Sequence, residues 1–243
     1  MERHDRYMVR INKYLAECGV CSRREADKYI EQGKVRVNQK TAVSGMQVSE
    51  QDVVEVVGKL VKPKQQKIVL AYYKPIGVTC TEKDAHADKT IIQALNFPVR
   101  LTYAGRLDKD SEGLIIMTND GELIQRMMRG ANRHEKEYTV KVNREITDEF
   151  LEKMSQGVYL KELEQTTRPC KLERKGKYTF RIILTQGLNR QIRRMCQEFG
   201  FKVTSLKRDR VMNIELAGLK SGEYREVQGE ELSRLYQLCG MKQ

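Results

Sequence analysis

The chain has 243 residues, of which 40% are hydrophobic and 32% are charged, a balance typical of a folded globular protein rather than a disordered one. Its formal net charge of +12 indicates a polyanionic partner. No apolar run approaches the roughly 20 residues that a transmembrane helix needs, and the polar residues 1–10 are not a secretory signal. We therefore expect a cytoplasmic protein that binds nucleic acid and no membrane.

The first predicted elements are two helices and two short strands. Apolar residues at the i, i+3, i+4 and i+7 positions of residues 11–18 predict a helix with one buried stripe. Ser22 and Glu25 have the spacing of a capping box, which predicts the start of a second helix. Residues 34–38 then alternate as a strand with basic residues on the exposed side, and residues 52–57 offer another strand.

Basic side chains stay off these apolar stripes and can gather on one outer face. They are Arg10, Lys13, Arg23, Arg24, Lys28, Lys34 and Arg36. A merely solvated face is the alternative, because helix exteriors are usually charged. The pattern, with R-I-N-K-Y-L-A-E-C-G-V-C-S-R-R-E-A-D and V-R-V-N, resembles the S4 RNA-binding domain. That resemblance implies phosphate contacts that hold structured RNA. We place the domain at residues 9–61, followed by a polar, proline-containing linker at residues 62–67.

The remaining residues, 68–243, mix strands and helices without strict βαβ alternation. This mixture predicts an α+β domain on a largely antiparallel sheet. Strands are expected at residues 68–73, 99–103, 114–117, 137–142, 178–184, 202–206 and 211–216. Helices are expected at residues 89–95, 121–129, 147–154, 190–199 and 230–238.

Asp108 stands in a short polar loop between two of these strands, where a rigid sheet can hold an acid in a cleft. A solvated turn acid is the ordinary alternative. A calcium loop is excluded, because such a loop needs a glutamate where Asn119 stands and a helix on each side. The full run G-R-L-D-K-D-S-E-G-L resembles the catalytic signature of the RsuA/RluB/RluF family of bacterial ribosomal pseudouridine synthases.

The predicted helix at residues 190–199 divides into an apolar and a basic side. Ile192, Met195, Cys196 and Phe199 share one side, and Arg190, Arg193, Arg194 and Gln197 share the other. Three arginines without an acid on their side favour contact with RNA or a carboxylate over a solvated face, because like charges repel unless an anion arrives.

The family resemblance implies that the protein isomerises a specific uridine of structured RNA to pseudouridine, with base flipping and an essential carboxylate, Asp108, that attacks the ribose or acts as its base. The run Q-G-L-N-R-Q-I-R-R-M resembles a later family motif. It implies Arg193 as the cationic partner of Asp108 and Ile192 as an apolar wall of the uracil pocket. Arg190 and Arg194 are then expected to bind the substrate RNA.

Two further side chains take roles from the same resemblance. Tyr138 resembles the family tyrosine that stacks on the target base, although its spacing from Val140 and Val142 equally fits core packing. Arg106 is a candidate to enter the stack that the flipped base leaves, and a simple phosphate contact is its alternative. We expect Asp108, Tyr138 and Arg193 to form the catalytic set.

No cofactor or metal is expected. The isomerisation needs neither oxidation nor phosphate energy, and the sequence has no G-x-x-x-x-G-K-[ST] or G-x-G-x-x-G motif. Cys18 and Cys21 form one C-x-x-C without a second pair at zinc-ligand spacing. Core packing is therefore the expected role of Cys18, and the six cysteines are expected to be reduced thiols.

The resemblance favours large-subunit (23S) ribosomal RNA as substrate and a monomeric enzyme, closest to the RluF-like enzymes. Small-subunit ribosomal RNA and tRNA are the alternative substrates. A non-catalytic RNA-binding or ribosome-assembly protein is the alternative function, but it would tolerate the loss of Asp108, Tyr138 or Arg193, and all three are present. A metal-dependent nuclease lacks a histidine or a second acid group at suitable spacing.

Overall fold

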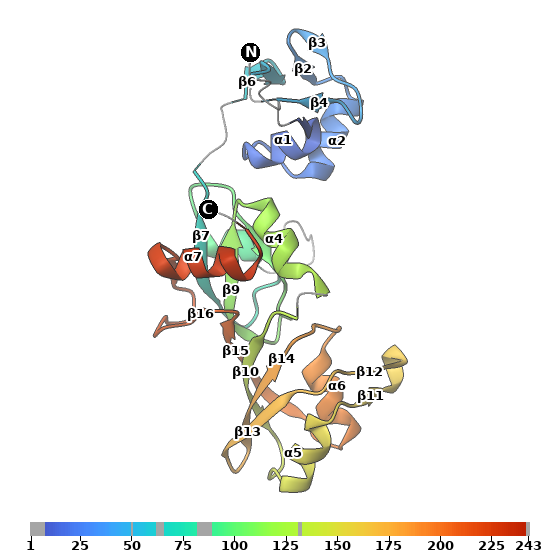
Figure 1. The fold of residues 1–243 in the computed structure, drawn as a ribbon, viewed down its shortest axis with the longest axis vertical. Helices are drawn as coiled ribbons and strands as arrows, with labels where there is room; N and C mark the ends of the chain where they lie inside the picture. Colours follow the sequence, from blue (N-terminus) through green and yellow to red (C-terminus); the bar gives the residue numbers. More distant parts are fainter. Residues whose placement is uncertain (1–7, 50, 62–65, 82–88, 131–132, 242–243) are drawn as a thin grey trace. The chain divides into compact units, whose positions relative to one another are not determined.

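The computed structural model describes residues 8–49, 51–61, 66–81, 89–130 and 133–241 (Figure 1). The chain divides into two compact units. The small unit is Met1–Lys67 with Val99–Leu101, and the large unit is Ile68–Pro98 with Thr102–Gln243. Residues 62–65 of the expected linker lie outside the described residues. Each unit is described here by itself.

The small unit packs two helices against short strands. Its elements are β1 (Val9–Arg10), α1 (Ile11–Glu17), α2 (Arg23–Glu31), β2 (Val35–Val37), β3 (Lys40–Thr41), β4 (Gln47–Val48), β5 (Val54–Val56) and β6 (Lys59–Leu60). The capping box is present, since the Ser22 hydroxyl accepts from the Glu25 amide at 3.2 Å and a Glu25 carboxylate oxygen accepts from the Ser22 amide at 3.1 Å. Cys18 and Cys21 are both buried in the apolar core of this unit.

The large unit is built on a nine-stranded sheet in the order β13-β14-β10-β15-β9-β7-β17, with β8 paired to β9 and β16 to β15. The strands of this sheet are β7 (Val69–Lys74), β8 (Thr102–Ala104), β9 (Glu112–Thr118), β10 (Lys136–Val142), β13 (Lys171–Gly176), β14 (Thr179–Leu184), β15 (Val203–Val211), β16 (Ile214–Glu215) and β17 (Tyr224–Glu226). Its pairings are antiparallel except that of β9 with β15, which confirms the expected α+β domain.

Helices cover the sheet of the large unit (Figure 1). They are α3 (Ile91–Leu95), α4 (Gly121–Met128), α5 (Asp148–Ser155), α6 (Gln191–Glu198) and α7 (Gly229–Leu238), with a 3₁₀ turn at Lys161–Leu163 beside the small hairpin β11 (Tyr159–Leu160) and β12 (Gln165–Thr166). The fully buried Leu123 of α4 and Leu235 of α7 belong to one core cluster with Leu114 and Ile116 of β9. Burial of these apolar faces fixes both helices on the sheet.

The structure differs from the expected elements in several places, apart from short two-residue strands that were not expected. The strand expected at residues 99–103 begins only at Thr102, and the strands expected at 202–206 and 211–216 are one long strand, β15, and a two-residue strand, β16. Strands β13 and β17 were not expected, because most of their side chains are exposed and polar. Their backbones form strands by hydrogen bonding to neighbouring strands, and this pairing does not require an alternating pattern of apolar side chains.

The short parallel pairing of β9 with β15 brings two backbones into unusually close contact. Gly113 stands opposite Arg208 with φ +110°, and a Cβ added to it would lie 2.3 Å from the Arg208 carbonyl oxygen and 2.6 Å from its nitrogen. Only glycine fits there. The registers of the neighbouring strands extend this pair into one row across the sheet: Ile182, Tyr138, Arg208, Gly113 and Lys74.

We expect Gly113→Ala to destabilise the large unit by about 3 kcal/mol or more, because the new methyl group meets backbone that cannot rotate away and the positive φ is strained for alanine. Urea unfolding monitored by circular dichroism measures the change. Gly176→Ala is the control, since its Cβ would meet only the Thr179 Cβ at 3.9 Å. Equal stability of the two variants would contradict the close contact.

Candidate active site

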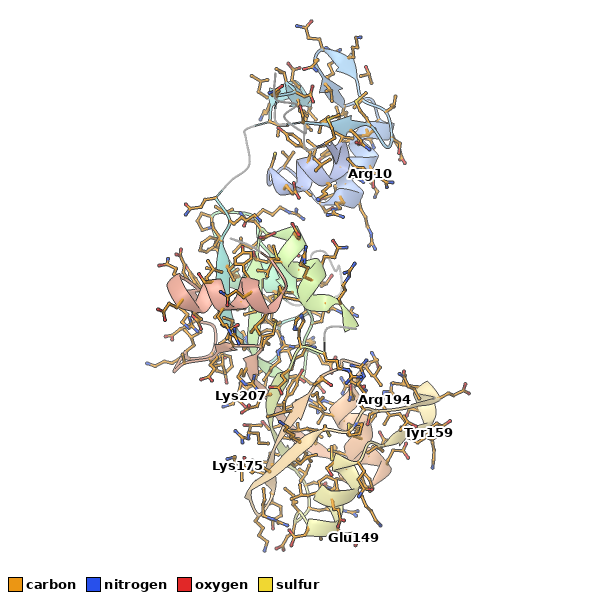
Figure 2. The ribbon with its side chains drawn as sticks, viewed as in Figure 1. Arg10, Glu149, Tyr159, Lys175, Arg194 and Lys207 are labelled. Carbon is orange, nitrogen blue, oxygen red and sulfur yellow. The ribbon has the colours of Figure 1, made fainter. Side chains whose placement is uncertain are left out.

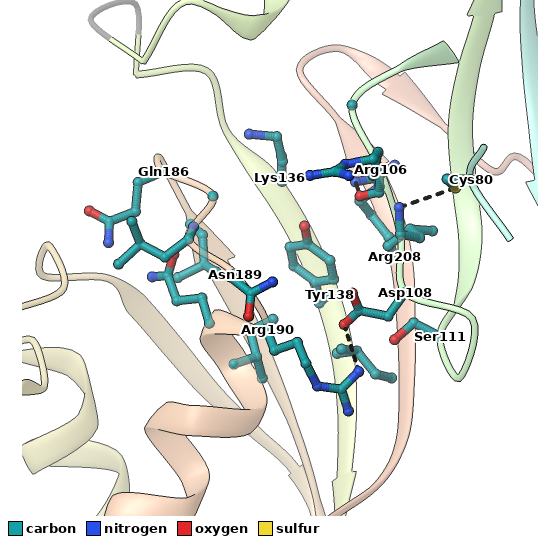
Figure 3. A pocket seen from close by; sticks show the side chains of 18 of the residues that line it. Cys80, Arg106, Asp108, Ser111, Lys136, Tyr138, Gln186, Asn189, Arg190 and Arg208 are labelled. Carbon is teal, nitrogen blue, oxygen red and sulfur yellow. Dashed lines mark hydrogen bonds and ion pairs between the residues drawn. The ribbon is translucent and has the colours of Figure 1, made fainter. Parts of the chain in front are cut away.

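A pocket of about 510 Å³ opens in the large unit beside the Tyr138–Arg208–Gly113 row (Figure 3). Its lining comes from residues 79–80, the loop before β9, the end of α4, the first half of β10, the middle of β15, and the turn from β14 into α6. The lining includes Cys80, Arg106, Asp108, Ser111, Lys136, Tyr138, Gln186, Arg190, Ile192 and Arg208. Segments distant in sequence therefore meet around one space.

Asp108 lies in this pocket with about a third of its side chain exposed, at 35%. The Arg190 Nη1 lies 3.3 Å from its carboxylate (Figure 3). Arg190 also donates to both carboxylate oxygens of Asp110, at 3.2 and 2.9 Å, and this hydrogen bonding lowers the pKa of Asp110. One guanidinium thus serves two loop carboxylates.

Arg193 does not form the expected ion pair with Asp108. Its Nη2 donates to the Asp110 carbonyl at 2.9 Å and to the Ser111 hydroxyl at 3.1 Å, and its Nη1 donates to the Val203 carbonyl at 3.4 Å. The reason is local. Arg190 adopts a left-handed conformation, φ 48°, immediately before α6 and reaches Asp108, whereas Arg193 stands almost one turn later and meets the end of the loop. In this structure Arg190 is the arginine that pairs with Asp108, whereas Arg193 pairs with the Asp110 carboxylate at 3.3 Å.

Arg194, labelled in Figure 2, is not among the residues that line the pocket. It pairs with Glu162 and donates to the carbonyl and side chain of Asn189, at 3.0 and 3.1 Å. The sequence predicts a basic side of α6 that faces no acid, but in the structure each of its three arginines is paired with an acid. The acids that oppose its arginines come from other segments, so a helical projection of α6 alone could not reveal them.

Tyr138 and Ile192 line the pocket as expected. Tyr138 is 9% exposed and lies on β10 between Ile182 and Arg208, so it contributes to the sheet and to the pocket wall together. Its ring and the Asp108 carboxylate point into the same space (Figure 3). Ile192, 4% exposed, supplies an apolar wall from α6.

Arg208 was missed by the sequence analysis. It is 2% exposed, and it holds the Asp108 loop at both ends: its Nε donates to the Leu114 carbonyl at 2.7 Å and its Nη1 to the Arg106 carbonyl at 3.4 Å. Its Nη2 is buried without a hydrogen-bond partner. Arg208 stands in the charged run K-R-D-R of β15, where nothing in the sequence distinguishes a buried arginine from an exposed one.

Two more buried groups bond to backbone near the pocket. Lys74 is fully buried and donates to the carbonyls of Pro75 and Val78, both at 2.8 Å, and burial lowers its pKa. The Cys80 thiol accepts from the Leu107 amide at 3.4 Å, and burial raises its pKa. In the sequence, the only signal for a special role of Lys74 is its place between an apolar strand and Pro75.

Two cations of the pocket have no acidic partner within the described parts of the chain. Arg106 is exposed at the pocket edge, two residues before Asp108. Lys136 is half-buried on β10, and its pKa is lowered by burial and by the neighbouring charge of Arg208. The Arg106 guanidinium and the Lys136 ammonium can therefore each bind an anionic ligand.

In the small unit, three of the expected RNA-binding residues gather around a cavity of about 290 Å³. Arg10, Lys13 and Arg23 line it, and Lys13 also pairs with Glu17 at 3.6 Å. The other expected residues, Arg24, Lys28, Lys34 and Arg36, are exposed on the same unit. Among the described helices, none is long and apolar enough to cross a membrane.

Comparisons with known proteins agree with this arrangement. Residues 68–198 match the RNA pseudouridylate synthase family, and residues 9–54 match the S4 domain. The dual-specificity RNA pseudouridine synthase RluF of Escherichia coli K12 is 47% identical over 232 residues, which cover 95% of this chain and 79% of the relative. The ribosomal large subunit pseudouridine synthase B of Bacillus subtilis is 35% identical over 238 residues, 96% of this chain and 97% of the relative.

A solved structure of a pseudouridylate synthase superposes on the chain with a TM-score of 0.69 at 28% sequence identity, covering 93% of this chain and 99% of the other. The match therefore extends beyond the catalytic loop to nearly the whole chain. The chain belongs to the RNA pseudouridine synthase family and carries an S4 domain ahead of its catalytic domain.

Proposed function

We propose that this enzyme converts a specific uridine of large-subunit (23S) ribosomal RNA into pseudouridine. The observation that carries the proposal is the Asp108 carboxylate, 3.3 Å from Arg190, in a pocket walled by Tyr138 and Ile192. The pocket can take a flat, flipped base between an aromatic ring and an aliphatic side chain. The name of the Bacillus subtilis relative supports a large-subunit substrate.

The chemistry places each side chain at a defined step. The bond between C1′ of the ribose and N1 of uracil breaks, the base turns, and C5 bonds to C1′. C5 then loses its proton and N1 takes one up, so the reaction is a net isomerisation. Asp108 acts at the ribose, as nucleophile on C1′ or as base. Arg190 supplies the opposing charge once the base excludes water. Tyr138 stacks on the base and keeps it in the pocket while it turns.

Arg193 and Arg208 act as positioning residues in this proposal. Arg193 fixes the loop at Asp110 and Ser111, and Arg208 fixes it at Arg106 and Leu114. A reacting carboxylate must be held within a fraction of an ångström of its productive position. Arg106 then fills the stack that the flipped base leaves, or binds a neighbouring phosphate.

The remaining expectations follow from this assignment. We propose residues 9–61 as the domain that holds RNA, residues 62–67 as the linker and residues 68–243 as the catalytic domain. The enzyme is proposed to act in the cytoplasm, where ribosomal RNA is modified, and as a monomer. Small-subunit ribosomal RNA and tRNA stay the alternative substrates.

Asp108→Asn should abolish pseudouridine formation and leave RNA binding near wild type, because it removes the reacting charge and no basic side chain. Chemical mapping of pseudouridine in ribosomal RNA from cells with and without the gene identifies the site, and tritium release from C5 of labelled substrate measures the rate. Isomerisation at the normal rate by this variant would end the proposed mechanism. EDTA should not slow the wild type.

Arg190→Gln should lower the single-turnover rate by about a hundredfold or more and change unfolding free energy by no more than about 0.5 kcal/mol, because the side chain is 41% exposed. Arg193→Gln should lower the rate comparably and destabilise the protein by about 1–3 kcal/mol, because it leaves loop acceptors unpaired. Arg194→Gln is the control with a near-normal rate. Normal turnover by Arg190→Gln would contradict Arg190 as the functional partner of Asp108 and would favour Arg193 in that role.

The double variant R10Q/R23Q should weaken RNA binding and make the slope of log affinity against log salt shallower by about 2, because each lost phosphate contact removes about one unit. Turnover at saturating RNA should stay unchanged. Filter binding across a salt series measures the slope. The control K40Q/K59Q removes two exposed charges from edge strands outside the Arg10–Arg23 cavity. Equal slopes for both variants would mean that the Arg10–Arg23 cavity does not contact RNA.

A further inference from the structure

The large unit holds a second cavity, of about 720 Å³, that shares no lining residue with the Asp108 pocket. It lies among the C-terminal ends of α4 and α7, the start of β10 and the turn between β15 and β16. We call it the arginine cavity. Its polar lining residues are Arg126, Arg129, Arg133, His134, Glu135, Arg210, Asn213 and Arg234.

Two of its five arginines are neutralised within the protein. Arg126 pairs with Glu122 at 2.9 Å, and Arg210 pairs with Glu135 at 2.9 Å and with Glu137 at 3.2 Å. These pairs hold the wall of the cavity in place. Their charges are therefore largely satisfied before any ligand arrives.

The other three, Arg129, Arg133 and Arg234, are exposed and have no acidic partner in the described parts of the chain. They come from the end of α4, the segment before β10 and the middle of α7. Three guanidinium groups around one cavity repel each other unless an anion lies between them. Their planar donor groups match the geometry of phosphate oxygens.

Buried polar atoms in the same cavity point to a ligand that is more than a free phosphate. Asn213 donates from Nδ2 to the Glu231 carbonyl at 2.8 Å, which leaves its Oδ1 buried without a donor. The Nε2 of His134 is also buried without a partner, and burial lowers the pKa of this imidazole, which favours its neutral form. A phosphodiester offers no proton to Asn213, whereas a ribose 2′-hydroxyl or a base N–H does.

The two sites are joined by the same strands. Lys136, which lines the Asp108 pocket, stands two residues after His134, and Arg210 stands two residues after Arg208. At about 3.3 Å per residue this offset is about 7 Å, close to the spacing of neighbouring phosphates along an RNA strand. An RNA strand that leaves the Asp108 pocket past Lys136 can therefore reach the arginine cavity.

We propose that the arginine cavity binds a nucleotide of the substrate RNA outside the uridine that reacts. Arg129, Arg133 and Arg234 bind its flanking phosphates, and Asn213 accepts from its sugar or base. The inference rests on RNA being the substrate. It adds a docking site on the catalytic unit that works through affinity and register, separate from the chemistry at Asp108.

The triple variant R129Q/R133Q/R234Q tests the charges. We expect its salt slope for RNA binding to be shallower by about 2–3, its KM to rise about tenfold or more, and its kcat at saturating RNA to stay unchanged. The control K141Q/R144Q/K202Q removes three exposed cations at the opposite end of β10 that have no acidic partner among the described residues. It should behave like wild type.

A second variant tests the neutral contact. Asn213→Ala should raise KM by about threefold to tenfold, the effect of one hydrogen bond, and leave the salt slope unchanged because no charge is lost. Equal slopes for the two triple variants, or a fall in kcat with KM unchanged, would overturn the arginine cavity as an RNA site. Failure of the wild type to form pseudouridine would instead contradict the proposed function, so the two failures are distinguishable.

Discussion

The close approach of β9 and β15 at Gly113 is the contact on which the active site depends. Because Gly113 has no side chain, the Arg208 backbone can lie against it, and the Arg208 guanidinium can reach the carbonyls of Arg106 and Leu114. Asp108 lies between those two carbonyls in the chain. A larger residue at this position would separate the strands and release the loop that presents the carboxylate.

The electrostatics of the pocket are unbalanced toward positive charge. Of the described residues that line it, the cations are Arg106, Lys109, Lys136, Arg190 and Arg208, and the only acid is Asp108. Among the described residues, Arg208 has no carboxylate partner, and the backbone carbonyls that accept from it offset part of the cost of burying its charge. A ligand that brings phosphates into this space restores the balance. The substrate thereby completes the interactions of the site as well as occupying it.

Under the proposed function, affinity and chemistry are separated in the molecule. The small unit offers Arg10 and Arg23, the arginine cavity offers three guanidinium groups, and the Asp108 pocket holds the groups proposed to react. Contacts to phosphates set position and affinity but not sequence. Contacts far from the reacting uridine can therefore determine which uridine enters the Asp108 pocket.

The sequence alone determined the elements that depend on local interactions. The Ser22–Glu25 capping box, the helix that Thr147 begins and the polar loop carrying Asp108 were predictable, because caps and apolar periods act over a few residues. The motif resemblance also placed Tyr138 and Ile192 in one pocket. Tertiary structure alone decided that Arg190 rather than Arg193 reaches Asp108, that Arg208 is buried, and that β13 forms a strand. These outcomes depend on which distant segments meet, because the partner of a charge or a backbone hydrogen bond is set by packing in three dimensions.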